Sequence, residues 1–492
     1  MQIVSGNVKN TTVVHAPDNK GACRSDFPAI LAACATPGNF VILPAIANSL
    51  VPMETADTLI HARWIVPVEP DGVVLDHHSL VIRDGRISAV LPSATARSRY
   101  TARDIVELPA HALIPGLVNA HTHAAMSLFR GLADDLPLMD WLTQHIWPAE
   151  AKWISPEFVR DGVRLAAAEM LKSGTTCMND MYFFPEDAAS VLREAGLRAC
   201  LGLILIDFPT NYAQTPDEYF EKGLKLHDSL RHDPLLRTAF APHAPYSVSD
   251  ATLAKVRTVN NELNLPVHMH VHETAHEVQE AVTKTGQRPL ARLDALDLLG
   301  PSLVAVHMTQ LTAEEIARLS ISGASVVHCP ESNLKLASGF CPVHTLLSAG
   351  VNVALGTDGA ASNNDLDMLG ELRTAALLAK AVSGDATAVP AHTALRMATL
   401  NGAKALGLDT EIGSLRVGKA ADITAIDLSA LSSQPVYDPV SQIVYTASRE
   451  QVTDVWVAGK RLLANRTLTT LDEAAILRTA QNWRAKIQGS NL

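Results

Sequence analysis

Short apolar segments alternate with longer segments of helical periodicity between residues 111 and 409. This order is typical of βαβ units and of a parallel sheet. Eight such units in about 300 residues favour a TIM-like (β/α)8 barrel over an open doubly wound sheet, so the predicted fold class is α/β. No Gly-x-Gly-x-x-Gly motif follows a strand, which argues against a dinucleotide fold. The expected barrel strands are 113–119, 175–179, 198–206, 237–242, 266–271, 303–307, 324–328 and 351–356, and the expected helices include 156–172, 251–263 and 312–319.

On either side of this region the chain has the alternation of short strands. Asp-Gly dipeptides at 71–72 and 84–85 favour tight hairpin turns between the upstream segments. Neither flank holds enough strands for a closed sheet. We therefore predict that residues 53–110 and 410–470 combine into one small β-sandwich domain beside the barrel at 111–409, followed by a C-terminal helix over 471–492. Strands are expected near 59–66, 80–83, 86–91, 421–427 and 452–459, with a similar segment at 413–418.

The first 52 residues lack this regularity. Proline and glycine interrupt a moderately apolar stretch there, and the preceding part lacks the compact basic start of a signal peptide. We expect residues 1–52 to be a poorly structured or non-conserved extension, with a small subdomain as the alternative.

Composition and charge narrow the classes of partner. The chain has 40 basic and 51 acidic residues, a net charge of −11, and no basic cluster, so nucleic acid and anionic membranes are poor candidates. It has no run of about twenty apolar residues that would span a membrane. Six cysteines without a C-x-x-C motif suit a reducing compartment, and we expect a cytoplasmic protein.

The strongest candidate chemistry begins at His121-Thr-His123. In an extended segment, residues two apart share a face, so both imidazoles can point at one metal ion such as zinc. Two histidines in a polar loop are the commoner explanation of an isolated His-x-His. However, active-site residues of such barrels lie at the carboxyl ends of strands, and six of the eight predicted strands end in His or Asp. This favours a metal site; the other strand-end residues are His243, His268, His270, His272, His307, His328 and Asp358.

These residues form motifs that resemble those of a known family. His121-x-His123, His270-x-x-Glu273, His307 and Gly356-Thr-Asp358 occur in the order found in the amidohydrolase superfamily. Further matches are the segments 114–121, 328–336 and 417–422. The resemblance covers residues 58 to 460 and is strongest for the branch of aminohydrolases that act on purine- and triazine-type rings. Within that branch the chain looks most like the 5′-methylthioadenosine/S-adenosylhomocysteine deaminases.

The resemblance implies a metal site of four ligands. His121, His123, His270 and Asp358 would bind one ion, expected to be zinc, although iron suits the same ligands. Relatives with two metals use a lysine at the end of strand four, where this chain has His243. The same resemblance selects His270 from three alternating histidines of strand five. His268 then lies deeper in the strand, and His272 is a neighbour either of the pocket or of the metal ligands.

The family mechanism assigns three catalytic roles. Asp358 would accept a proton from the attacking water, and Glu273 would donate one to the ring nitrogen beside the attacked carbon. His307 would orient the water and stabilise the tetrahedral centre before ammonia leaves. General acid–base catalysis of this kind contributes roughly 10²–10⁴-fold.

Specificity is expected to depend on residues 124–155, a segment too long for an ordinary barrel loop. By resemblance, Glu150 in this segment would receive the two ribose hydroxyls of a nucleoside, and His243 would contact the purine. The alternative is an apolar helix in which Glu150 is a solvated charge. Residues 201–209, in and after the third strand, contain none of the arginines that some relatives carry there, which weakens the case for S-adenosylhomocysteine. The expected substrate is therefore 5′-methylthioadenosine, with S-adenosylhomocysteine or adenosine as alternatives.

Other functions stay open at this point. The chain could deaminate a free purine or pterin, or act as a triazine amino- or chlorohydrolase. A non-catalytic barrel scaffold is disfavoured because all four ligands, Glu273 and His307 are present together. By analogy with relatives of this architecture, we expect a homo-oligomer, either a dimer or a tetramer.

Overall fold

The strands that flank the barrel in the sequence meet in one mixed sheet. The structure, a computed structural model, describes residues 53–489. The nine strands have the order β17-β16-β15-β14-β5-β1-β3-β4, with β2 paired to β1. The pairing of β5 with β14 joins the upstream strands to the downstream ones, as predicted. Their bounds are β1 (Glu54–Ile65), β2 (Leu75–Asp76), β3 (His78–Arg83), β4 (Arg86–Pro92), β5 (Tyr100–Pro115), β14 (Ile423–Asp427), β15 (Val452–Val457), β16 (Lys460–Ala464) and β17 (Thr467–Leu468).

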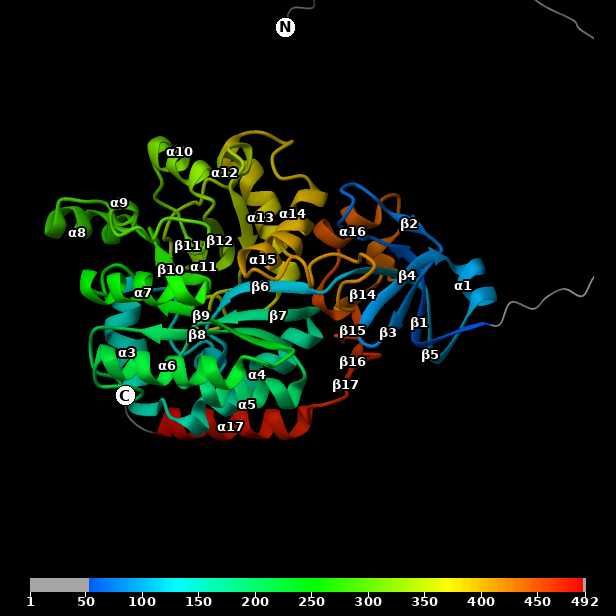
Figure 1. The fold of residues 1–492 in the computed structure, drawn as a ribbon, viewed down its shortest axis with the longest axis horizontal. Helices are drawn as coiled ribbons and strands as arrows, with labels where there is room; N and C mark the ends of the chain where they lie inside the picture. Colours follow the sequence, from blue (N-terminus) through cyan, green and yellow to red (C-terminus); the bar gives the residue numbers. More distant parts are fainter. Residues whose placement is uncertain (1–52, 490–492) are drawn as a thin grey trace, which may run out of the picture. The chain divides into compact units, whose positions relative to one another are not determined.

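The central region is the predicted barrel. Eight parallel strands follow the order β13 to β6, and a bridge between Thr122 and Asp358 links the last strand region to the first. Figure 1 shows the barrel beside the mixed sheet, whose strands come from both ends of the described chain. The bounds are β6 (Leu117–Thr122), β7 (Thr175–Asp180), β8 (Arg198–Leu205), β9 (Leu236–Pro242), β10 (Val267–Val271), β11 (Leu303–His307), β12 (Ser325–His328) and β13 (Asn352–Leu355).

Helices follow the barrel strands as the periodicity predicts. Helix α4 (Pro156–Lys172) begins where its sequence signals a start, because the Ser155 side chain accepts a hydrogen bond from the Phe158 N–H and Pro156 occupies the first turn. The other α-helices are α1 (Ser93–Arg99), α2 (Leu138–Trp141), α3 (Trp147–Trp153), α5 (Pro185–Ala195), α6 (Pro216–Leu230), α7 (Asp250–Leu263), α8 (Ala275–Thr285), α9 (Pro289–Ala295), α10 (Ala313–Ser322), α11 (Pro330–Lys335), α12 (Val343–Ser348), α13 (Met368–Ser383), α14 (Ala391–Met397), α15 (Leu400–Ala405), α16 (Pro439–Tyr445) and α17 (Glu473–Gly489). Short 3-10 or π turns are η1 (Ala124–Phe129), η2 (Leu142–Ile146), η3 (Leu431–Ser433) and η4 (Arg449–Gln451).

The predicted first barrel strand, 113–119, is wrong at its start. Leu113 belongs to β5 of the mixed sheet, where it pairs with β1 and β14, and the barrel strand β6 begins at Leu117. Gly116 lies between them, where a Cβ would come within 2.0 Å of the Thr176 side chain. The chain therefore crosses from sheet to barrel at a point that only glycine fits. The expected segment 413–418 is likewise a loop and not a strand.

A buried ion pair joins the barrel to the mixed sheet. Arg198, at the start of β8, donates from Nε to Asp422 Oδ2 at 2.8 Å and from Nη2 to Oδ1 at 3.1 Å. The Ala458 N–H also donates to Asp422, at 2.7 Å. The two side chains are only 6% and 1% exposed. The motif at 417–422 thus ends in a residue that connects the two parts of the fold.

Other predictions concern the ends and the surface of the chain. The expected extension, residues 1–52, lies outside the described residues. Within residues 53–489, no helix has the length and apolar character needed to cross a membrane. The four cysteines of this range, Cys177, Cys200, Cys329 and Cys341, are buried free thiols.

Candidate metal centre

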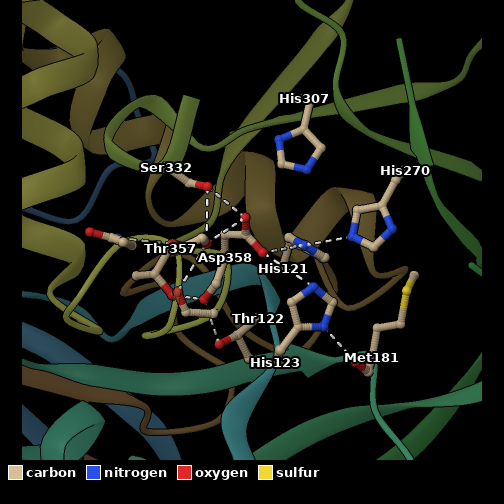
Figure 2. A network of polar contacts seen from close by, with 12 residues as sticks. His121, Thr122, His123, Met181, His270, His307, Ser332, Thr357 and Asp358 are labelled. Atoms are coloured by element: carbon tan, nitrogen blue, oxygen red, sulfur yellow. Dashed lines mark hydrogen bonds and ion pairs between the residues drawn. The ribbon is translucent and has the colours of Figure 1, made fainter. Parts of the chain in front are cut away.

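Four side chains from three strand ends converge at the mouth of the barrel. His121 and His123 lie at the end of β6, His270 lies in β10, and Asp358 follows β13. One ligand atom from each lies within 4.8 Å of the others. Figure 2 shows the three imidazoles grouped around the Asp358 carboxylate. These are the four residues that the sequence motifs select, and His121 and Asp358 are almost completely buried.

The nitrogen and oxygen atoms that face one another suit a metal ion. His121 Nε2 and His123 Nε2 each lie 3.2 Å from Asp358 Oδ1, and His270 Nε2 lies 3.2 Å from His121 Nε2. The opposite ring nitrogen of His123 donates to the Met181 carbonyl at 2.6 Å, and that of His270 donates to the His243 carbonyl at 2.9 Å. With the proton held on Nδ1, Nε2 presents a lone pair to the centre. Such outer hydrogen bonds are typical of zinc-binding histidines, so the donor set fits zinc.

His268 contacts the third histidine ligand, His121, on the side away from the metal centre. It lies deeper in β10, fully buried, with its Nε2 2.8 Å from His121 Nδ1. Burial, reinforced by the neighbouring histidines, keeps the pKa of His268 well below its ordinary value. It is therefore a neutral imidazole that orients His121 from behind. His272, which was expected beside the pocket, turns away, because the backbone after Val271 takes a positive φ of 55° at His272 and its Nε2 accepts the Leu290 N–H.

Asp358 is fixed by two serine hydroxyls. Ser332 donates to its Oδ2 at 2.7 Å and Ser362 donates to the same oxygen at 3.0 Å, which leaves Oδ1 facing the histidines. Burial alone would raise the pKa of Asp358, but its contacts with His121 and His123 outweigh it and hold the pKa well below the ordinary value. Its φ of 61° is unusual for a residue with a side chain, and such strained backbone is common at functional sites.

Glu273 and His307 lie beside this cluster. His307 ends β11 with a φ of 74°, and its Nδ1 donates to Asn333 Oδ1 at 2.8 Å. Its Nε2 is 3.9 Å from Glu273 Oε2. Burial raises the pKa of Glu273, and the Asp358 charge adds to the effect although His307 opposes it. The Glu273 N–H donates to Glu277 at 2.7 Å, which secures the turn after β10. A buried carboxyl group with a raised pKa thus lies next to the candidate metal site.

A cavity of about 520 Å³ opens above these residues, within the range of small-molecule sites. The segment 124–155 forms much of its wall, as predicted. Glu150 and His243 both line it. Burial lowers the pKa of His243 to about 3, with help from His123 and His121, so its imidazole is neutral. No lysine or arginine of the described chain lines the cavity, whose apolar walls include Leu138, Trp141, Leu142, Ile146, Trp147, Ile204, Ile206 and Phe208.

Sequence reasoning missed the residues that support the named ones. Ser332 lies within the segment 328–336, which matches the family, but the sequence indicated no role for this residue. Tyr182 lies two residues after β7 and donates to Glu150 Oε1 at 2.8 Å, and only its place after a strand end could have indicated it. His328, a strand-end histidine, is buried and does not line the cavity. A position at a strand end therefore indicates where the site lies, but it does not distinguish a metal ligand from a residue that only packs in the core.

Comparison with known proteins gives consistent similarities. Residues 112–462 match the family described as the amidohydrolase family. A 5-methylthioadenosine/S-adenosylhomocysteine deaminase of Teredinibacter turnerae is 53% identical over 433 residues, which is 88% of this chain and 98% of that protein. The crystal structure of an adenosine deaminase from Xanthomonas campestris with bound zinc is 57% identical, with a TM-score of 0.88 over 89% of this chain and all of that one. Atrazine chlorohydrolase from Arthrobacter aurescens shares the fold, with 22% identity and a TM-score of 0.81 over 87% of this chain and 99% of that one.

Proposed function

The chain belongs to the amidohydrolase family, and from that premise we propose that it is a metal-dependent deaminase of 5′-methylthioadenosine and S-adenosylhomocysteine. The observation that carries the proposal is the convergence of His121, His123, His270 and Asp358 at the floor of a nucleoside-sized cavity. The similarity to methylthioadenosine/S-adenosylhomocysteine deaminases over nearly their whole length supports the same activity. The reaction adds water to the adenine ring and releases ammonia, which leaves an inosine derivative.

We propose one zinc ion per subunit at the four ligands. When bound, zinc supplies Lewis acidity and lowers the pKa of a coordinated water to about 7 in favourable sites. The cavity is lined by no lysine in the described chain, so no carbamate is available there to bridge a second ion. Three imidazoles and one carboxylate also suit iron, and metal analysis of the purified protein distinguishes the two.

The protein side chains move the protons. Asp358, which is ionised, takes a proton from the attacking water on its carboxylate. Glu273, whose pKa burial raises, donates in its protonated form to the ring nitrogen beside the attacked carbon and makes that carbon more electrophilic. The Nε2 of His307 lies beside Glu273 and orients the water, because its Nδ1 is held by Asn333. The proton on Asp358 then passes to the exocyclic amine, which leaves as ammonia. The hydroxyl proton on the attacked carbon returns to Glu273 as the carbonyl forms.

The cavity wall supports 5′-methylthioadenosine as the preferred substrate. S-adenosylhomocysteine carries a charged amino-acid tail, and its carboxylate would need a cationic or strongly polar partner when desolvated. The described residues offer no lysine or arginine in the cavity wall. A methylthio group instead needs only apolar contact, which Ile204, Ile206 and Phe208 can provide. Glu150 is proposed to receive the ribose hydroxyls and His243 to contact the purine.

An ammonia-release assay tests the function. Zinc-loaded protein should be compared on 5′-methylthioadenosine, S-adenosylhomocysteine, adenosine, guanine and an aminotriazine. We expect the highest kcat/KM for 5′-methylthioadenosine and the lowest for the free base and the triazine. Faster turnover of guanine or the triazine would overturn the nucleoside assignment. The expected homo-oligomer stays a prediction, which light scattering coupled to size-exclusion chromatography measures.

A further inference from the structure

A tyrosine outside every motif makes a direct contact with the proposed ribose-binding carboxylate. Tyr182 lies just beyond β7, is 5% exposed and donates from its hydroxyl to Glu150 Oε1 at 2.8 Å. Glu150 belongs to α3, in the segment that follows the first barrel strand. Both side chains line the cavity above the candidate metal centre. The hydrogen bond thus connects a rigid strand end to the carboxylate of a helix that closes the pocket.

This hydrogen bond is not needed to attach helix α3. Asn211, in the loop after β8, already donates from Nδ2 to the carbonyls of Ala151 at 2.9 Å and Ile154 at 3.1 Å. Those bonds hold the helix backbone and do not involve the Glu150 side chain. Within residues 53–489, no side chain other than Tyr182 hydrogen-bonds to the Glu150 carboxylate. Tyr182 therefore selects the rotamer of one functional group.

The same contact affects the charge of that group. Burial raises the pKa of Glu150 to about 7, while the hydrogen bond from Tyr182 and the nearby His123 oppose the rise. An ionised carboxylate has only acceptor sites, whereas a protonated one must spend an oxygen as a donor. Two vicinal hydroxyls are best received by the ionised form. Loss of the phenol would thus weaken both the orientation and the acceptor capacity of Glu150.

We propose that Tyr182 is a positioning residue that fixes the Glu150 carboxylate to accept the 2′- and 3′-hydroxyls of a ribose, and so sets a preference for ribonucleosides over deoxynucleosides. This inference rests on the proposed nucleoside deaminase function. With Oε1 held by the phenol, Oε2 and the second lone pair of Oε1 can face the sugar. The role is one of specificity, because Tyr182 acts through Glu150 and not on the reacting carbon.

The test is steady-state deamination of adenosine, 2′-deoxyadenosine and 3′-deoxyadenosine by the zinc-loaded enzyme. Wild type should favour adenosine. In Tyr182→Phe we expect kcat/KM for adenosine to fall on the order of tenfold, mostly through KM, since a hydrogen bond to a charged group is removed. The deoxynucleosides should change little, so that the ratio of ribo to deoxy substrates falls towards one. In a Glu150→Gln background, where the charge is already absent, Tyr182→Phe should add little.

Tyr212→Phe is the matched control. The Tyr212 hydroxyl also donates to a carboxylate, Glu186, at 3.4 Å, and Tyr212 is 3% exposed but does not line the cavity. Its removal should leave the substrate ratio unchanged. If wild type deaminates neither these nucleosides nor 5′-methylthioadenosine, the proposed function fails. If wild type prefers adenosine and Tyr182→Phe keeps the same ratio, or Tyr212→Phe lowers it equally, the role of Tyr182 is wrong while the function stands. Additive effects of Tyr182→Phe and Glu150→Gln would also overturn it.

Discussion

Buried charge occurs at both ends of the barrel strands, with opposite arrangements. At the start of β8, the Arg198–Asp422 pair is complete: both Asp422 oxygens receive donors, and the charges neutralise each other. At the strand carboxyl ends, the Nε2 atoms of His121, His123 and His270 meet Asp358 Oδ1 with their lone pairs directed inwards. A satisfied ion pair connects parts of a fold, whereas converging lone pairs suit a cation. Buried charge alone therefore does not identify a metal site. The site is identified by ligand atoms that point at one another and have lone pairs available.

The comparison predicts that the polar groups at the carboxyl ends of the strands serve turnover rather than stability. In Glu273→Gln we expect kcat to fall by roughly 10²–10⁴-fold, because the proposed proton donor to the ring is replaced by an amide. Zinc content and the free energy of unfolding should stay close to wild type, since Glu273 is outside the four-ligand set. Kinetics, metal analysis and urea unfolding measure the three quantities.

The matched control for this variant is Glu186→Gln, which alters a carboxylate that does not line the cavity. It should keep wild-type kcat. Unchanged turnover in Glu273→Gln, or loss of its zinc, would contradict the assignment of Glu273 as a proton donor that does not bind the metal.

Some parts of the fold and of the candidate site could be predicted from the sequence, and others could not. The eight barrel strands follow from the alternation of apolar segments, which is a local signal. The four converging residues follow from the strand ends together with the motifs of the family that the chain resembles. The split between β5 and β6 at Gly116 depends on a neighbour, Thr176, that is distant in sequence. The turn at His272 depends on a positive φ that no side-chain pattern encodes. Tyr182 was missed because its partner, Glu150, lies on a separate element.

At the opposite end, removal of charge should cost stability and spare turnover. Asp422→Asn leaves the buried Arg198 without its counter-ion, and breaking such a pair typically costs about 3–5 kcal/mol in the free energy of unfolding. The kcat of the folded enzyme should be unchanged, because neither residue lines the cavity. Urea unfolding and kinetics on the same preparation measure both effects.

An exposed pair of the same geometry provides the control. Arg318 donates from Nε and Nη2 to the two Asp294 oxygens, both at 2.7 Å, but the side chains are 44% and 35% exposed. Asp294→Asn should shift the unfolding midpoint far less, because water solvates the freed charge. Equal shifts in the two variants would show that burial does not distinguish these pairs.

The smallest expected effect concerns Ser332, a residue that supports a metal ligand. Ser332 is fully buried and donates to Asp358 Oδ2 at 2.7 Å, so it orients a metal ligand without binding the metal. Loss of such an outer contact typically weakens metal affinity or activity by about 10–100-fold. For Ser332→Ala we expect zinc affinity to fall by about tenfold, the lower end of this range, because Ser362 still donates to the same oxygen. Zinc affinity, measured by competition with a chromogenic chelator, should fall without loss of the fold.

Ser338→Ala is the matched control for Ser332→Ala. Ser338 is also a buried serine, but within the described residues its hydroxyl has no hydrogen-bond partner. Its replacement should leave zinc affinity unchanged, because no ligand depends on it. A drop in affinity for both variants would mean that any small cavity near the barrel mouth loosens the metal centre. A drop for Ser332→Ala alone would show that the direction of the Asp358 carboxylate, and not packing around it, prepares this end of the barrel for a cation.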